Sequence, residues 1–536
     1  MKGRIPKKPV LVVLGVSVIL VLGFIVTANA QGPVTDDEFS AKREPAVSLA
    51  AAAVTPIPWE GDTSLPPYIG EPAKAHPLPP TKASQNPFFA PNPFSNYHND
   101  TWMSDTYDIA GPLGRAPKAW SSNLAAALKS PETTKLFHCG TLAFDSHGRI
   151  VTICSNSVQT TAVLMDPDSL EVLTYLDLPK AGGQTAGLGA GYMMLDNLDR
   201  AWSPIGDQIV VVKQTGGPDH TTFSYKRYDL SSVVPAGDAI NSLVPDFKGR
   251  IWFVVRYSGI VGVLDPDTGS VQQLRLGEEI SNSFAMDGMD AYIVTTVRLY
   301  RLTAGDDNVP HMVWAAPEYQ NIHSKKDGQL SAGSGTTPTL LDHGKYVAIA
   351  DNANQTHVVV YRTAEQLGPK KDRVVCEAPV FDPGAGAVED SLVGSGRSLI
   401  VSNNDGYTYD LQHPEYQTVP GVARVDIDRN GKNCDAVWTN SQVNPASYGA
   451  KLSTKTGLIY IVAVKLDPSR KSTDYPEGVT VWYWTAIDFR TGETVWEQLA
   501  GTGRWFDGYW PLSFIGPKGA LYTAGNGGIF AVRDTR

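Results

Sequence analysis

The sequence predicts an all-β protein folded as an eight-bladed β-propeller, with seven blades as the alternative. Strand–turn–strand hairpins recur along the chain at a spacing of roughly 40–55 residues, which is typical of propeller blades. Glycine is abundant, at 50 of 536 residues, and long amphipathic helical patterns are scarce, which favours sheet over helix. A chain of this length exceeds one ordinary sandwich and suits a large propeller with appendages.

The clearest hairpin lies near the C-terminus. Trp482–Asp488 is aromatic and β-branched, the turn Phe489–Gly492 follows, and Glu493–Leu499 resumes a strand. Weaker copies of this plan occur at Ala162–Leu176 and Val261–Leu276. A different hairpin, with two apolar strands and a turn rich in Asp, Gly or Lys, precedes each of these outer hairpins; examples are Leu142–Ile153, Leu243–Val255 and Leu512–Ala524. Two successive hairpins therefore predict one four-stranded antiparallel blade.

Residues 1–30 carry a targeting signal. Basic residues precede an uninterrupted apolar run, Val10–Val26, and the small residues Ala28–Ala30 offer a cleavage site. The run is long for a signal peptide and short for a spanning helix, so a cleaved signal and a single retained membrane anchor both remain open. Either alternative predicts that the rest of the chain is exported, as a secreted or a membrane-anchored protein.

Two segments precede the blades. Residues 31–85 are rich in Pro and Ala without periodicity, which predicts an extended linker. Residues 86–132 differ, because Asn86–Gly114 holds six aromatic residues in a short span. A disordered linker rarely carries so many aromatic rings, so we expect this segment to dock on the propeller.

Eight units follow, and we assign residues 133–536 to the propeller. The last unit supplies only three strands, so we expect an N-terminal segment, just before or at Lys135–Phe137, to complete it and protect its edge. The units are Thr133–Pro179, Gly191–Val234, Asn241–Gly277, Glu279–Glu318, Ser334–Phe381, Ala387–Ser441, Ser447–Gly501 and Gly508–Arg536.

Four cysteines agree with export. Cys139 and Cys154 flank one hairpin almost symmetrically, so antiparallel pairing predicts a disulfide between them. Cys376 and Cys434 lie in expected outer strands of neighbouring blades. They form either a second disulfide or two half-buried free thiols. Neither a C-x-x-C pair nor a Cys/His zinc spacing occurs.

The hairpin Ala486–Trp496 matches the pattern A-x-D-x-x-T-G-x-x-x-W. This resembles the PQQ-like tryptophan-docking repeat of the quinoprotein-alcohol-dehydrogenase-like propellers, which implies eight blades with Trp496 packed between them. Catalytic members carry a disulfide between adjacent cysteines beside the cofactor, and some a C-x-x-C-H haem site; this chain has neither. We therefore do not expect bound pyrroloquinoline quinone. His98–Asp105, Asn282–Asp287 and Gly333–Leu341 also look similar to exported bacterial propellers of unassigned activity.

Polar residues recur in or beside the expected innermost strands of blades four, five and six. They either line the central channel, where they could hold Ca²⁺ or supply an acid/base pair, or cap tight turns. These ligand-binding candidates are Asn282, Thr336, Asp351, Asn352, Glu389, Asp390, Asn403, Asn404 and Asp405.

His98 and Asp100 are the second set of candidates. Placed over the channel mouth, His98 beside a carboxylate could act as a general base. In the alternative, His98 and Asp100 satisfy local backbone groups while Trp102 anchors the segment.

These observations predict an exported propeller that binds a ligand or partner at its channel mouth, whether or not the signal remains as a membrane tether. The alternative is a Ca²⁺-assisted hydrolase or lactonase-like enzyme that uses Glu389, Asp390 and Asn404. A quinone-dependent dehydrogenase is third, and catalytic residues stay unknown. The net charge is −10, and the basic residues form no cluster along the sequence. Nucleic-acid binding needs a clustered basic face, so we do not expect it. We expect a monomer.

Overall fold

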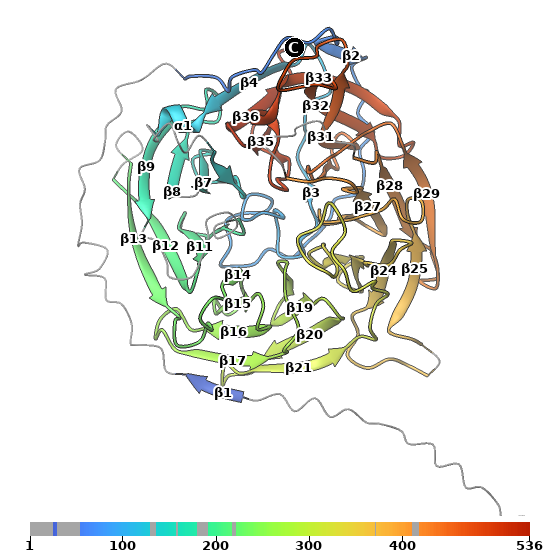
Figure 1. The fold of residues 1–536 in the computed structure, drawn as a ribbon. Coiled ribbons are helices and arrows are strands. Elements are labelled where there is room, and N and C mark those ends of the chain that lie inside the picture. The colour runs from blue at the N-terminus through green and yellow to red at the C-terminus, as the bar shows by residue number, and fades with distance from the viewer. Residues whose placement is uncertain are drawn as a thin grey trace, which may run out of the picture.

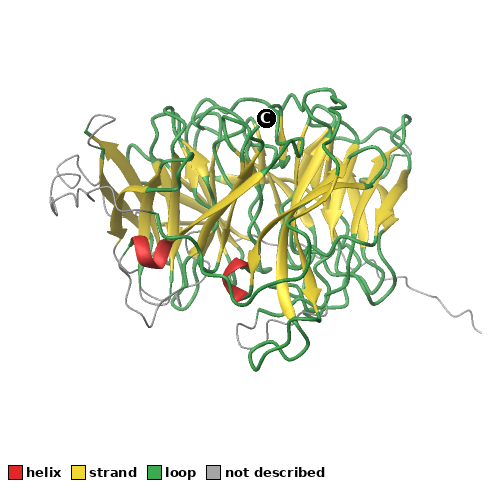
Figure 2. Ribbon diagram, turned by 90° about the horizontal axis from the view of Figure 1, so that it is seen from above, coloured by secondary structure: helices red, strands yellow, loops and turns green. Residues whose placement is uncertain are grey.

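In the computed structural model, the strands form eight sheets around a central axis, so the chain is an eight-bladed β-propeller (Figure 1). The structure describes residues 25–28, 54–128, 136–156, 159–178, 191–216, 221–369, 371–409 and 418–536. Seen at right angles to this view, the strands stand between two layers of loops (Figure 2). The prediction of eight blades is confirmed.

Blades one to four follow the chain in order. Blade one contains β5 (His138–Cys139), β6 (Ala143–Phe144), β7 (Ile150–Ser155), β8 (Thr160–Met165) and β9 (Val172–Leu178). Blade two contains β10 (Met194–Leu195), β11 (Ala201–Ile205), β12 (Gln208–Thr215) and β13 (Thr222–Asp229). Blade three contains β14 (Ile240–Pro245), β15 (Ile251–Val255), β16 (Ile260–Leu264) and β17 (Val271–Arg275), with β1 (Ile25–Ala28) antiparallel to β17. Blade four contains β18 (Ala285–Asp287), β19 (Asp290–Val294), β20 (Leu299–Ala304) and β21 (Pro310–Ala315).

Blades five to eight complete the ring. Blade five contains β22 (Thr339–Leu341), β23 (Tyr346–Ala350), β24 (His357–Arg362) and β25 (Val374–Pro379). Blade six contains β26 (Val393–Ser395), β27 (Ser398–Ser402), β28 (Val422–Ile427) and β29 (Cys434–Asn440). Blade seven contains β30 (Lys451–Ser453), β31 (Leu458–Asp467), β32 (Val479–Asp488) and β33 (Thr494–Thr502). Blade eight contains β34 (Phe514–Ile515), β35 (Leu521–Gly525), β36 (Gly528–Arg533) and β4 (Lys118–Asn123). The short helices are α1 (Leu124–Ala127) and the 3-10 helix η3 (Arg504–Phe506).

Turn chemistry explains why the hairpins form where they do. In blade three, the Asp246 carboxylate accepts hydrogen bonds from the amides of Lys248 (2.9 Å) and Arg250 (3.1 Å), and it pairs with the Arg250 guanidinium at 2.7 Å. Gly249 takes a φ of 86°, a conformation that glycine adopts without steric cost. The apolar strands on either side of this turn are buried between neighbouring blades.

Blade eight closes with an N-terminal strand, as expected, but from an earlier segment. β4 pairs antiparallel with β36 along its whole length. The expected location was the segment just before or at Lys135–Phe137; Lys135 lies outside the described residues, and the Phe137 amide donates to the carbonyl of Asn526 (3.1 Å) as the chain enters blade one. A partner for β36 must match its six residues, and Lys118–Asn123 supplies six. The propeller therefore includes residues before 133.

The Pro/Ala-rich stretch also contacts the propeller in its described part, 54–85. β2 (Tyr68–Gly70) pairs antiparallel with β33, and the Ser64 amide donates to the Asp467 carboxylate at 2.6 Å. An extended backbone, which prolines favour, suits the edge of a sheet, and this explains how a linker-like composition joins blade seven.

The predicted signal or anchor falls mostly on residues 1–24, which lie outside the described part of the chain. Among the described residues, no helix is long and apolar enough to span a membrane.

Both predicted disulfides are present. Cys139 of β5 and Cys154 of β7 are directly paired in register, and their sulfurs are 2.06 Å apart. The second disulfide joins Cys376 of β25 to Cys434 of β29, so it links the outer strands of blades five and six.

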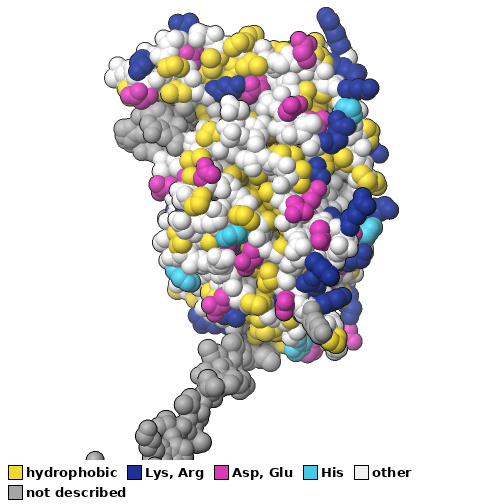
Figure 3. Space-filling model, turned by 90° about the vertical axis from the view of Figure 1, so that its right-hand side faces the viewer, with side chains coloured by type: hydrophobic (Ala, Val, Ile, Leu, Met, Phe, Trp, Pro, Cys, Tyr) yellow, Lys and Arg dark blue, Asp and Glu magenta, His cyan; other side chains and the backbone are white. Residues whose placement is uncertain are grey.

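On the outer side of the propeller seen in Figure 3, charges of both signs are interspersed with apolar side chains, and Lys and Arg are more frequent toward one edge.

The segment 86–114, called the plug below, lies within the ring of blades, where it forms the light-blue trace of Figure 1. Part of it is β3 (Thr106–Tyr107), which pairs parallel with β30. Carbonyl groups of the plug accept hydrogen bonds from inner-strand amides of six blades. These bonds are Phe144 to Phe94 (3.3 Å), Leu195 to Ser95 (2.6 Å), Met286 to Thr101 (2.8 Å), Leu340 to Trp102 (3.0 Å), Gly394 to Ser104 (2.7 Å) and Leu452 to Asp105 (3.1 Å). The plug thus connects blades that are far apart in sequence.

Candidate functional site

A cavity lies in the central channel against the plug, and we call it the channel pocket. It provides about 70 Å³ of space for the centres of water-sized molecules. Tyr97 of the plug forms part of its wall. Most of the remaining wall comes from residues at the start of blades one, two, three, four, six and eight, including His138, Tyr192, Asn241, Ser281, Glu389 and Trp510. Leu330, from the loop between blades four and five, also lines it.

Two adjacent carboxyl groups, Glu389 and Asp390, line the pocket from the loop before β26. Asn404 fixes this loop, because its Oδ1 accepts hydrogen bonds from the amides of Glu389 (2.9 Å) and Asp390 (3.3 Å). The Asn404 Nδ2 also donates to Asp390 Oδ2 at 2.7 Å. Glu389 Oε2 accepts from the Leu330 amide at 3.0 Å. Within the described part of the chain, the other oxygen of each carboxyl has no hydrogen-bond partner, and neither group forms an ion pair.

Burial raises the pKa of both acids, because a buried carboxylate loses the solvation that stabilises its charge. The pKa of Glu389 rises to about 8; the nearby Asp390 carboxyl raises it further, while the hydrogen bond from Leu330 opposes the change. Burial also raises the pKa of Asp390 well above its usual range, against the effect of Asn404. At pH 7, with no cation beside it, Glu389 is therefore mostly protonated.

Four aromatic side chains form much of the remaining wall. The rings of Tyr97 and Tyr192 meet edge to face, with centroids 5.2 Å apart. The rings of Tyr509 and Trp510 meet in the same way at 4.7 Å. The Tyr97 hydroxyl donates to the Trp510 carbonyl, and the Trp510 indole donates to the carbonyl of Gly328 at 3.2 Å. These bonds hold the rings in place before any ligand arrives.

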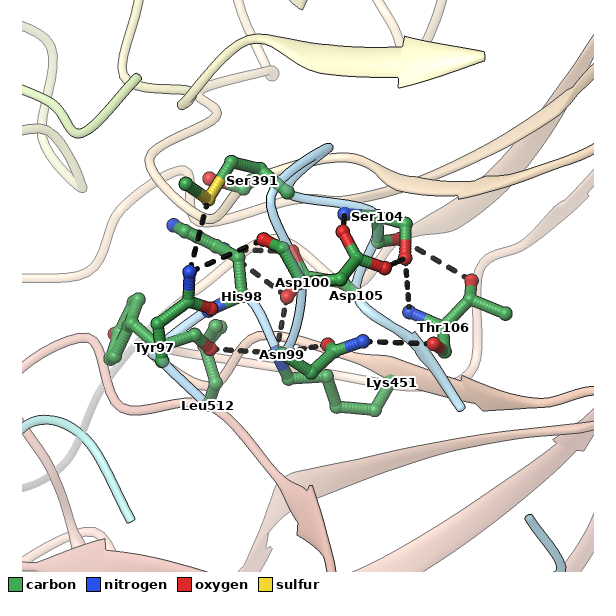
Figure 4. A network of polar contacts seen from close by, with 12 residues as sticks. Tyr97, His98, Asn99, Asp100, Ser104, Asp105, Thr106, Ser391, Lys451 and Leu512 are labelled. Carbon is green, nitrogen blue, oxygen red and sulfur yellow. Dashed lines mark hydrogen bonds and ion pairs between the residues drawn. The ribbon is translucent and has the colours of Figure 1, made fainter. Parts of the chain in front are cut away.

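Beneath the pocket wall, the plug carries a buried network of charges (Figure 4). His98 Nδ1 is 3.0 Å from Asp105 Oδ2, and the Lys451 ammonium of β30 pairs with the other oxygen of Asp105. Lys451 also donates to the Tyr97 carbonyl (2.8 Å) and to Asn99 Oδ1 (3.2 Å). Burial lowers the pKa of His98 and of Lys451, although Asp105 opposes both changes. His98 Nε2 is buried without a hydrogen-bond partner among the described residues.

Asp100 closes a turn within the plug. Its Oδ1 accepts from the amides of Trp102 (2.9 Å) and Ser104 (3.2 Å), and its Oδ2 accepts from the Ser104 hydroxyl (2.5 Å). Burial raises the pKa of Asp100 to about 7. Asp100 thus satisfies local backbone groups, whereas His98 contacts the rings of Tyr97 and Tyr192, with centroids 4.9 and 6.2 Å away.

The other predicted site residues lie outside the pocket wall, where they hold loops together. Equivalent positions in a repeat share turn chemistry, and this accounts for the recurrence seen in the sequence. Their contacts are Asn282 Nδ2 to the Ser334 carbonyl (2.8 Å), Thr336 Oγ1 from the Ala350 amide (2.9 Å), Asp351 Oδ2 with His357 Nδ1 (2.8 Å), Asn352 Nδ2 to Asn321 Oδ1 (2.9 Å), Asn403 Nδ2 to the Ala385 carbonyl (2.9 Å), and the Asp405 amide to Asn403 Oδ1 (3.2 Å).

The arrangement does not fit the donor set that a calcium site needs. Asn404 Oδ1, a presumed ligand in the hydrolase alternative, already accepts two backbone hydrogen bonds. Asp351 pairs with His357 and does not line the pocket that Glu389 and Asp390 line. Across the described residues, no group of three or more His, Cys, Asp or Glu side chains is placed to hold a metal ion. A quinone does not fit either, because the plug occupies the ring and no adjacent cysteines are present.

Sequence reasoning missed several pocket residues. Tyr192, Tyr509 and Trp510 line the pocket but were not among the predicted site residues. Lys451 gave no signal, because a lone lysine at the start of a strand predicts an exposed side chain. The available signal was the density of aromatic residues before blade eight and within the plug.

The chain is similar to several known proteins. No family model matches the chain. An uncharacterized protein of Archaeoglobus fulgidus is 25% identical over 488 residues, which covers 83% of this chain and 90% of that protein. Among solved structures, Chaetomium thermophilum Sqt1 is 12% identical with a TM-score of 0.46, covering 85% of this chain and 98% of that one. A streptogramin B lyase is 9% identical with a TM-score of 0.36 and coverage of 74% and 93%. Virginiamycin B lyase from Staphylococcus aureus is 10% identical with a TM-score of 0.38 and coverage of 72% and 99%. The PQQ-like resemblance stays a prediction.

Proposed function

We propose that this chain is an exported β-propeller that binds a small ligand in the channel pocket. The observation that carries the proposal is the pocket wall, where two buried carboxyl groups, each with one oxygen lacking a partner among the described residues, meet aromatic rings. A concave site with apolar walls and a few converging polar groups is the usual form of a small-molecule site.

The pocket is also preorganised for binding. Asn404 fixes the backbone that carries both acids, and hydrogen bonds fix the rings of Tyr97 and Trp510. Side chains that are already ordered lose little conformational entropy when a ligand binds, so more of the interaction energy appears as affinity.

Export is supported by the cysteines together with the predicted N-terminal signal. All four form disulfides, Cys139–Cys154 and Cys376–Cys434, and structural disulfides persist in oxidising compartments. Alkylation of the protein in its native host, followed by mass spectrometry, tests this part. We expect no alkylated cysteine before reduction; four alkylated cysteines would contradict export.

Filling the pocket tests ligand binding. Leu330 lines the pocket from a half-buried position, so Leu330→Trp adds volume at the wall with little risk to the core. Leu173→Trp makes the same change on the exposed outer strand β9. In saturation-transfer NMR with a mixture of fragment-sized molecules, we expect signals from the wild type and from Leu173→Trp, and their loss from Leu330→Trp. Equal signals from all three proteins would place binding elsewhere and refute the proposal.

A further inference from the structure

We infer that the channel pocket recognises a small organic cation, whose ammonium or guanidinium group lies between the carboxyl groups of Glu389 and Asp390 and the surrounding aromatic rings. This inference rests on the proposed function, because it names the ligand class of the same site. Its basis is the charge, the ring geometry and the size of the pocket.

The charge of the wall favours a cation. Glu389 and Asp390 lie side by side, and no Lys or Arg lines the pocket among the described residues. His138 also lines it, but burial lowers the pKa of His138 to about 4, so this ring is neutral at pH 7. An anion would meet two acids with no counter-charge in contact, whereas a cation would meet two carboxyl oxygens that lack partners.

Other charged groups act on the acids without occupying the pocket. Arg256 lies near Glu389 but already pairs with Glu279 (3.0 Å) and donates to the Leu330 carbonyl (3.0 Å). Lys325, on an exposed loop, has a smaller effect on Glu389, and Asp105 of the plug opposes ionisation of Asp390. Protonation keeps the acid pair neutral while the pocket is empty, and a cationic ligand would supply the charge that stabilises its ionised form.

The rings supply the second half of a cation site. A cation above an aromatic face is attracted by the ring's electrons, and the attraction is stronger when both partners are desolvated. Tyr97 and Tyr192 form one edge-to-face pair, and Tyr509 and Trp510 form another, so ring faces and edges point in several directions around the pocket. The cavity volume of about 70 Å³ suits a compact group such as trimethylammonium or guanidinium better than a sugar ring.

Binding of a cation should release protons. Because burial raises the pKa of Glu389 to about 8, a ligand charge beside it favours the ionised form and expels the proton. Affinity should then rise as the pH rises through about 8. A neutral ligand that hydrogen-bonds to the protonated acids would show the opposite pH dependence.

Calorimetric titration of the full chain tests the inference. The probes are tetramethylammonium and methylguanidinium, with tert-butanol and glycerol as neutral counterparts. At pH 8.5 we expect each cation to bind at least about tenfold more tightly than tert-butanol, a difference of about 1.4 kcal/mol. At pH 7 the heat of cation binding should depend on the buffer's ionisation enthalpy, and at pH 9 that dependence should shrink.

Matched variants separate the carboxyl pair from general charge. Glu389→Gln resembles the protonated acid, so it should fold normally yet bind the cations at least tenfold more weakly. Glu377→Gln makes the same change on the exposed outer strand β25 and should bind as the wild type does. Equal binding of tert-butanol or glycerol, abolished by Leu330→Trp, would keep the pocket as a ligand site but overturn the cation. Failure of all four probes to bind would overturn both proposals.

Discussion

Lys451→Met tests whether the buried charge network holds the plug in the ring. Lys451 and Asp105 are both fully buried and form an ion pair, and Lys451 also donates to the Tyr97 carbonyl and to Asn99. Removing one partner of a buried pair leaves an uncompensated charge and costs about 3–5 kcal/mol. Lys465→Met removes a lysine from a partly exposed pair with Glu497 in the same blade. A pair of that kind is worth about 0–1 kcal/mol.

The pH dependence of the Lys451→Met variant adds a second readout. In the wild type, burial and the Lys451 charge both lower the pKa of His98. Without Lys451, the Asp105 carboxylate faces His98 alone, so the folded-state pKa of His98 should rise relative to its value in the wild type. A raised folded-state pKa contributes stability that is present at low pH and is lost as the pH rises through that value. The deficit of Lys451→Met should therefore be smaller at pH 5 than at pH 8.

Urea unfolding followed by tryptophan fluorescence gives the free energies of unfolding of the wild type and both variants. At pH 8 we expect Lys451→Met to lose about 4 kcal/mol and Lys465→Met to lose less than about 1 kcal/mol. Equal losses in the two variants would show that the network does not stabilise the plug. A Lys451→Met deficit that does not change with pH would refute the role given to His98.

Three further predictions concern a buried acid, a disulfide and ring closure. Burial raises the pKa of Asp100 to about 7, so the stability that the protonated acid contributes is lost as the pH rises through 7. The melting temperature of Asp100→Asn should therefore fall less than that of the wild type between pH 6 and 8.5. An equal fall in both proteins would contradict this. Replacing Cys376 and Cys434 by Ser should cost about 2–4 kcal/mol in urea unfolding, and an unchanged midpoint would show that the link between blades five and six is dispensable. Replacing Lys118–Asn123 by a glycine–serine stretch of equal length removes β4 but keeps the plug; this variant should aggregate in size-exclusion chromatography, because β36 becomes an open edge, and a monodisperse monomer would oppose this.

Local patterns were enough to predict the blades. A turn such as Asp246–Arg250 is specified by neighbouring residues, and the strands beside it are buried on both faces. Ring closure was harder, because β4 (KAWSSN) has little apolar alternation and most of its side chains stay half-buried. Only its pairing with β36, far away in the chain, identifies it as a strand.

The candidate site was predictable in part for the same reason. Glu389 and Asp390 shared one sequence signal with Asp351, namely an acidic residue in or beside an expected innermost strand. That signal does not distinguish a side chain in the channel from one that pairs with a neighbour, as Asp351 does with His357. Tyr192 and Trp510 come together only because the ring brings blades two and eight to one cavity, and no local pattern records that contact.

Tyr97 connects the pocket to the charge network, so binding and stability should be coupled. Its ring lies in the pocket wall, while its carbonyl accepts a hydrogen bond from Lys451 at 2.8 Å. A ligand that binds only the folded chain stabilises it by RT ln(1 + [L]/Kd). Loss of Lys451 frees the backbone of Tyr97, so it should weaken binding of tetramethylammonium as well as fold stability. Lys465→Met should leave the affinity unchanged. Unaltered affinity in Lys451→Met, measured at a temperature where that variant is folded, would show that the pocket wall is independent of the network beneath it.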